Sequence, residues 1–194
     1  TNEQIAIWEG ARLTQDQARE LSGIRDVRWT NEYDTLLDTL VPAAIMVFVE
    51  ANQHPRCTCP VETRNARMTK ELKEKFPDAV LKNVYEIMAE MRQIKKPEEI
   101  KALRKACDIT NEGFRALLRF IRPGVGEWQI EGFLANEFIS RGPRKFSFLP
   151  IIASGKDTCV LHYIQNDKRC EDGGLVLMDI GTEYGNYNLS LIHI

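Results

Sequence analysis

The sequence predicts an α/β domain in residues 1–90 and an α+β domain from residue 91 onward. In the first part, apolar strand-like runs alternate with helix-like segments, which is typical of an α/β unit. In the second part, a proline-led helix signal and two amphipathic stretches come first, and short apolar strand-like runs follow. Helices followed by strands indicate helices that cover one face of an antiparallel sheet.

The composition is that of an ordinary globular protein. The 194 residues carry a net charge of -2, so we expect no nucleic-acid partner. No apolar run approaches the roughly 20 residues of a membrane helix, so we expect no membrane partner. Five cysteines match no zinc-binding spacing, which predicts free thiols in a reducing cytoplasm. The polar start, without a methionine or a signal peptide, predicts a chain that begins within a longer protein.

The first domain opens with a short alternating run and a capped helix. Residues 4–8 alternate and predict a strand. Residues 13–23 predict a helix with Thr14 as its N-cap and Gly23 as its stop.

The rest of the first domain continues the alternation. Residues 32–40 predict a helix that ends near Pro42. Residues 43–49 predict a strand with both faces covered, because the run is apolar without alternation. Loop, helix and strand are then expected in residues 52–60, 62–76 and 79–85.

The second domain opens with the clearest helix signal of the chain, and we place the boundary near residues 91–97. Pro97 followed by Glu98 and Glu99 is typical of a helix N-terminus. Apolar residues at steps of three and four then predict one buried stripe, formed by Ile100, Leu103, Cys107, Thr110, Phe114, Leu117 and Ile121. Residues 122–124 end this helix, and residues 127–140 predict a second one, which buries Ile130, Phe133, Leu134 and Phe138.

Strand-like runs follow in residues 146–152, 159–163 and 175–181. The last run carries Asp179, and His162 is expected on a neighbouring strand. A buried carboxylate is costly unless it is paired, and a metal ion is a common partner when another polar side chain is near. We therefore predict Asp179 as a metal ligand. The alternatives are a turn-forming aspartate at position 179 and, at position 162, a satisfied core or surface histidine.

These residues resemble the proline-specific aminopeptidases of the pita-bread metallopeptidase superfamily, and the aminopeptidase P family in particular. The resemblance rests on residues 94–100, 122–124 with Glu127, 152–155, 161–163, 174–181 and 183–184. It implies that residues 1–90 are the back part of a creatinase-like N-terminal domain. It also implies that residues 91–188 are the first portion of a pita-bread catalytic domain.

The resemblance implies a hydrolase with two manganese ions, held by two Asp, one His and two Glu. Asp179 matches the first of these ligands. His162 matches a histidine that is no metal ligand but hydrogen-bonds the substrate near the cleaved bond. The implied reaction releases the N-terminal residue from peptides with proline in second place, by attack of an activated water. A homo-oligomer is expected for the complete protein.

The resemblance breaks off after residue 188. The family places its second metal-binding aspartate about eleven residues after the first, on a strand whose alternate side chains point inward. Ser190 occupies that position here, and the remaining ligands have no counterpart. Residues 189–194 correspond to one reading frame of a transposon-derived sequencing adapter, so we expect them to be a non-native tail. The chain by itself is therefore expected to be inactive.

Two alternatives to an aminopeptidase stay open at this point. The first is a prolidase, which cleaves dipeptides ending in proline, because the residues that distinguish the two enzymes lie outside the matching part. The second is a pita-bread domain that has lost its metals and binds peptides without cleaving them. The presence of both Asp179 and His162 argues against the second alternative.

Overall fold

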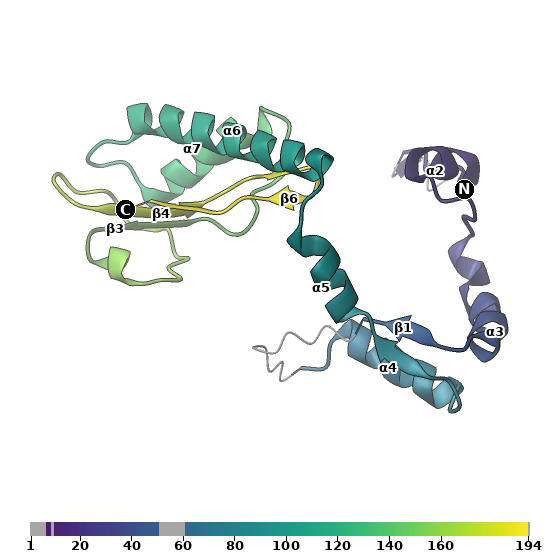
Figure 1. Ribbon diagram of the computed structural model, residues 1–194. Helices are drawn as coiled ribbons and strands as arrows, with labels where there is room; N and C mark the ends of the chain where they lie inside the picture. The colour runs from purple at the N-terminus through teal and green to yellow at the C-terminus, as the bar shows by residue number, and fades with distance from the viewer. Residues whose placement is uncertain (1–6, 9, 51–60, 194) are drawn as a thin grey trace. The chain divides into compact units, whose positions relative to one another are not determined.

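The structure, a computed structural model, describes residues 7–8, 10–50 and 61–193 (Figure 1). The chain folds into two compact units, Thr1–Gln93 and Ile94–Ile194. The predicted loop in residues 52–60 lies outside the described residues. Among the described residues, no helix combines the length and the apolar character needed to cross a bilayer.

The first unit is built from short helices and a two-stranded parallel sheet. Strands β1 and β2 pair in parallel, with Val47 opposite Leu81, and helix α4 lies between them in the chain. This strand–helix–strand order confirms the predicted α/β character. The elements in order are α2 (Gln15–Ser22), the 3₁₀ helix η1 (Thr30–Glu32), α3 (Tyr33–Ala43), β1 (Val47–Val49), α4 (Arg64–Lys75), β2 (Leu81–Asn83) and α5 (Tyr85–Gln93).

The caps of the first unit form as predicted, because they depend on local hydrogen bonds. The Thr14 hydroxyl accepts a hydrogen bond from the Gln17 amide at 3.2 Å, and the Gln17 side chain accepts one from the Thr14 amide at 2.9 Å. This reciprocal pair is a capping box. Gly23 ends α2 in the left-handed conformation, with φ of 71°, where glycine is favoured.

Several predictions for the first unit were wrong. In the run at residues 4–8, Ile7 and Trp8 are helical instead of extended and are 80% and 87% exposed, while residues 4–6 lie outside the described residues. Helix α3 continues through Pro42 to Ala43. Strand β1 begins only at residue 47, and Phe48 is 51% exposed, so its two faces are not both covered. The sequence prediction also missed α5.

The second unit has two helices over one face of an antiparallel sheet (Figure 1). Strand β4 is central, between β3 and β7, and both pairings are antiparallel. Together with the helices, this arrangement confirms the predicted α+β design. The elements in order are α6 (Pro97–Phe120), α7 (Glu127–Ile139), β3 (Ile151–Ser154), η2 (Gly155–Cys159), β4 (Val176–Ile180), β5 (Glu183–Tyr184), β6 (Tyr187–Asn188) and β7 (Leu191–His193).

The core of this unit lies between the helices and the sheet. Side chains from α6 and α7 meet those from β3 and β4, and the buried members include Ile109, Leu117, Ile130, Leu134, Phe138, Ile152, Met178 and Ile180. The predicted stripe on α6 is partly wrong, because Ile100 and Cys107 are exposed while Ala106, Ile109 and Gly113 are buried instead. The predicted face of α7 is confirmed for Ile130, Leu134 and Phe138.

Two predicted strands of the second unit also need correction. The run at residues 146–152 becomes a strand only from Ile151, and Phe146 forms an isolated bridge to Thr182. Residues 159–163 form no strand: Cys159 ends η2, and Leu161 and His162 lie in a turn. Left-handed Gly155, with φ of 58°, turns the chain out of β3 at this point. The run at residues 175–181 is confirmed as β4.

Candidate active site

Asp179 lies on the central strand β4, one residue before its end, and its side chain is half-buried. It is opposite Ile151 on β3 and Ile192 on β7. The Ser190 hydroxyl donates a hydrogen bond to Asp179 Oδ1 over 3.2 Å. The chain therefore brings position 190 back to the carboxylate, as the eleven-residue spacing predicts. Because Asp179 is within a strand, the alternative of a turn-forming aspartate is wrong.

His162 lies apart from any strand, in an exposed turn. Its neighbours Leu161 and Ile164 are also exposed, at 85% and 56%. Within the described part of the chain, no hydrogen bond or ion pair connects the imidazole to Asp179 or to any other side chain. The predicted placement of His162 on a strand beside Asp179 is therefore wrong. We call residues 160–168, which carry this side chain, the histidine loop.

A buried carboxylate that the sequence prediction gave no role fixes the histidine loop. Glu127, the first residue of α7, is 0% exposed. Its Oε1 accepts hydrogen bonds from the amide and the hydroxyl of Ser154, both over 2.7 Å. Its Oε2 accepts hydrogen bonds from the Tyr163 hydroxyl and the Lys168 amide, both over 2.9 Å. The only signal in the sequence was an acidic residue in a first helical turn, which is too common to predict this cluster.

Asn166 makes a second attachment of the histidine loop. It is 5% exposed and has a left-handed backbone, with φ of 47°. Its Oδ1 accepts a hydrogen bond from the Ile152 amide at 3.1 Å, and its Nδ2 donates one to Glu131 Oε2 at 2.8 Å. Glu127 and Glu131 are four residues apart and share one face of α7. Both α7 and β3 therefore hold the loop.

The electrostatics of this cluster act on Tyr163. Burial is the main cause that raises its pKa above the ordinary value for tyrosine, and hydrogen bonding to the carboxylates of Glu127 and Asp167 raises it further. A neutral tyrosine is favoured here because a phenolate would face two negative charges. Lys168 also forms an ion pair with Asp157, which holds the end of the loop near its start.

The donor atoms at Asp179 suit a divalent cation in kind but are few. A carboxylate and a hydroxyl are the oxygen ligands that hard cations such as Mn²⁺ and Mg²⁺ prefer. Among the residues that the structure describes, no group of three or more His, Cys, Asp and Glu side chains is placed to hold a metal ion. Asp179 with Ser190 can thus supply part of a metal site.

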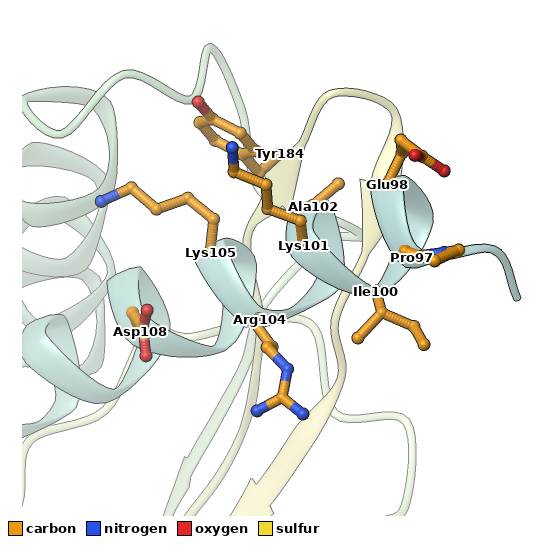
Figure 2. A pocket seen from close by; sticks show the side chains of 9 residues that line it. All are labelled: Pro97, Glu98, Ile100, Lys101, Ala102, Arg104, Lys105, Asp108 and Tyr184. Atoms are coloured by element: carbon orange, nitrogen blue, oxygen red, sulfur yellow. The ribbon is translucent and has the colours of Figure 1, made fainter.

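A surface groove of the second unit lies away from Asp179 and His162. The groove has a volume of about 550 Å³ and lies beside the first turns of α6. Figure 2 shows the Lys101 side chain next to the Tyr184 ring. Its charged side chains carry both signs: Glu98, Lys101, Arg104, Lys105 and Asp108. Neither Asp179 nor His162 lines this groove, so it is not the predicted site.

Comparisons with known proteins agree with the sequence pattern in both units. Residues 101–191 match the model of metallopeptidase family M24, and residues 1–48 match that of the aminopeptidase P N-terminal domain. A Xaa-Pro aminopeptidase of Escherichia coli (strain K12) is 32% identical over 182 residues, which are 93% of this chain and 41% of that protein. A Xaa-Pro dipeptidase of Pyrococcus horikoshii is 36% identical over 118 residues, or 61% of this chain and 34% of that protein.

A solved structure gives the same result. The chain matches a variant of Escherichia coli aminopeptidase P in complex with substrate, with a TM-score of 0.83 and 30% sequence identity. The match covers 99% of this chain and 44% of that one. The chain thus spans less than half the length of these relatives.

Proposed function

We propose that the whole protein is a Xaa-Pro aminopeptidase. The premise is that this chain belongs to metallopeptidase family M24 and joins part of that domain to an aminopeptidase P N-terminal domain. It would release the N-terminal residue from peptides whose second residue is proline. One observation carries this proposal. The part of the chain that matches family M24 contains both Asp179, on the central strand β4, and His162, in a loop anchored by hydrogen bonds.

Asp179 is the residue of this chain that we assign to the metal. When bound, two divalent ions, manganese in our proposal, would acidify a shared water so that hydroxide is available near neutral pH. The Asp179 carboxylate supplies oxygen ligands for that centre. His162 would donate a hydrogen bond to the substrate beside the cleaved bond, where negative charge develops in the transition state. Its exposed position leaves the imidazole open to a peptide.

The test is a peptidase assay on the whole protein loaded with manganese. We expect cleavage of a Xaa-Pro-Yaa tripeptide, and loss of both activity and one bound metal equivalent in D179N. D172N is the matched control, since Asp172 is an exposed aspartate on the same stretch of chain. Full activity of D179N would contradict the proposal. The 194-residue chain alone should be inactive, since it supplies too few ligands.

A prolidase is the second candidate, favoured by the match to the Pyrococcus horikoshii dipeptidase. The same assay with a Xaa-Pro dipeptide separates the two, because a prolidase would cleave the dipeptide and leave the tripeptide intact. A metal-free peptide-binding module is the third, and it would bind these peptides without turnover and without manganese.

The setting of the whole protein is also part of the proposal. We infer a cytoplasmic protein, supported by cysteines without a zinc or disulfide pattern. The family resemblance of the sequence is the basis for proposing a homo-oligomer. Light scattering coupled to size-exclusion chromatography tests the oligomeric state, and a monomer would contradict it.

A further inference from the structure

We propose that Glu127 is the positioning residue of the active site: it fixes the histidine loop and thereby holds the His162 imidazole where the substrate binds. This inference rests on the proposed function, because it takes His162 as the substrate-binding group. Glu127 itself touches no predicted metal ligand in the structure, and its effect would pass through the loop.

The burial of Glu127 is the first argument. A fully buried carboxylate is costly unless hydrogen bonds and favourable dipoles compensate it. Glu127 has both, because it accepts four hydrogen bonds and lies in the first turn of α7, where the helix dipole favours negative charge. An apolar side chain at position 127 would leave these donors without their acceptor, so the carboxylate is what holds the four groups together.

The second argument is where the four donors come from. Ser154 ends β3 before the histidine loop, Tyr163 lies inside the loop, and Lys168 is its last residue. The Glu127 amide also donates a hydrogen bond to the Lys168 carbonyl at 2.8 Å. One residue thus joins the strand that precedes the loop, its middle and its end to the start of a core helix.

The third argument concerns His162 itself. The imidazole has no hydrogen-bond partner among the described residues, so the backbone of the loop decides where it lies. The nearest fixed point is the next residue, Tyr163, which is 5% exposed and bonded to Glu127. Removing that anchor should let the histidine move while the core remains folded.

The chemistry of the cluster supplies an isosteric test. All four groups around Glu127 are donors, and a carboxylate offers only acceptors. In E127Q an NH₂ group replaces one of the two carboxylate oxygens. Its N–H groups then face the donors that this oxygen served, which are either those of Ser154 or those of Tyr163 and Lys168. The shape of the side chain is kept. The Ser154 or Tyr163 hydroxyl can turn to accept from the new N–H group, but the backbone amide on the same side, of Ser154 or of Lys168, loses its acceptor. At least one of the four hydrogen bonds is therefore lost.

The experiment compares wild type, E127Q, H162A and E127Q/H162A in the whole, manganese-loaded protein. Hydrogen exchange in residues 160–168 should become roughly tenfold faster or more in E127Q, as expected for the loss of hydrogen bonds to a charged group. We expect kcat on a Xaa-Pro-Yaa peptide to fall by a similar factor with little change in KM. E171Q is the control, because Glu171 is exposed, and both readouts should stay at wild-type values.

The double variant separates positioning from general destabilisation. If Glu127 acts through His162, E127Q/H162A should be no slower than H162A alone, because coupled residues are not additive. Independent, multiplying losses would overturn the proposal, and so would unchanged exchange of the loop in E127Q. Should E127Q fail to fold, Y163F removes a single hydrogen bond and should give the same pattern with a smaller effect.

The activity of the wild-type protein tests the proposed function independently of the role of Glu127. If wild type cleaves no Xaa-Pro peptide, the proposed function fails, and the part of this inference that concerns catalysis fails with it. Hydrogen exchange in the loop still shows whether Glu127 holds it. If wild type is active and E127Q matches it in both readouts, only the positioning role is refuted.

Discussion

The Tyr163 hydroxyl anchors the histidine loop by donating its single proton in a hydrogen bond. Its hydroxyl lies 2.9 Å from Glu127 Oε2 and 3.0 Å from Asp167 Oδ1. A phenol has one proton to donate, so the two carboxylates compete for the same hydrogen bond. Ionisation of Tyr163 would remove that bond and place a third negative charge among them. The protonation of this residue should therefore be linked to folding.

We predict that Tyr163 makes the protein less stable at high pH. Its folded-state pKa is raised above the unfolded value of about 10, so the unfolded state loses its proton first as pH rises. The stability contributed by neutral Tyr163 is complete below pH of about 10 and declines above it. Urea unfolding at a series of alkaline pH values should show a smaller decline for Y163F than for wild type.

The control for this measurement is Y184F, because Tyr184 is a tyrosine of the same unit whose side chain is 39% exposed. It should follow the wild-type pH dependence. Equal slopes for Y163F and wild type would contradict the linkage.

Position 190 carries a second prediction at the level of one residue. Ser190 donates to Asp179 from the place where a second carboxylate would complete the pair that the family pattern requires. We predict that S190D makes the chain bind Mn²⁺ more tightly by about tenfold or more, since carboxylates can bridge or share a hard cation. Isothermal titration with MnCl₂ measures this. D179N/S190D should lose the gain, and an equal affinity of the two variants would show that the pair does not cooperate.

Helices were predictable here where their signals are local. The capping box of α2 and the N-terminal contact of α6 lie within four residues of sequence, and in α6 the Lys96 amide donates to Glu99 Oε2 at 2.7 Å. The histidine loop was not predictable in the same way, since its hydrogen bonds join Tyr163 and Asn166 to residues more than thirty positions away on α7. The strand-like run at residues 159–163 looks like a strand until those distant partners are known.

The buried face of α6 gives the same lesson for packing. The sequence pattern at steps of three and four included Cys107, but the neighbouring helix α7 covers a face shifted toward Ala106, Ile109 and Gly113. Small residues such as Ala106 and Gly113 allow the two helices to approach closely. A search for large apolar residues at helical spacing does not identify such positions. Which of two adjacent stripes is buried is thus decided by α7, not by α6 alone.

We predict that G113A destabilises the second unit although alanine favours helices. An added Cβ would lie 2.6 Å from Cε1 of Phe138, which is 1% exposed and packed within the core of the second unit. Overpacking of this kind costs about 1–3 kcal/mol, which exceeds the gain of up to about 1 kcal/mol in helix propensity. The free energy of unfolding in urea should therefore fall.

Gly132 provides the matched control on α7. An added Cβ there has no atom within 4 Å, so G132A should raise the free energy of unfolding by about 0.5–1 kcal/mol. A gain in both variants would mean that α6 and α7 can separate without cost at Gly113.

At the scale of the whole molecule, the buried core is unevenly divided between the two units. Among the described residues, Val41, Val49 and Leu72 are the buried apolar side chains of the first unit. The buried side chains of α6, α7, β3 and β4 all belong to the second unit. The candidate active site, with Asp179, His162 and Glu127, also lies wholly in that unit. Function and stability are therefore expected to depend on the same half of this chain.

We predict from this division that the first unit opens before the second. Burial of apolar surface is the main favourable term in folding, and regions with little buried apolar surface exchange their amide hydrogens through low-energy openings. In this 194-residue chain, hydrogen exchange followed by mass spectrometry should show fast exchange in α2, α3 and α4 under conditions where α6, α7 and β4 remain protected. Increasing urea should remove the protection of β1 and β2 first. A single transition, with α4 and α7 losing protection together, would contradict the prediction that the smaller core of the first unit opens first.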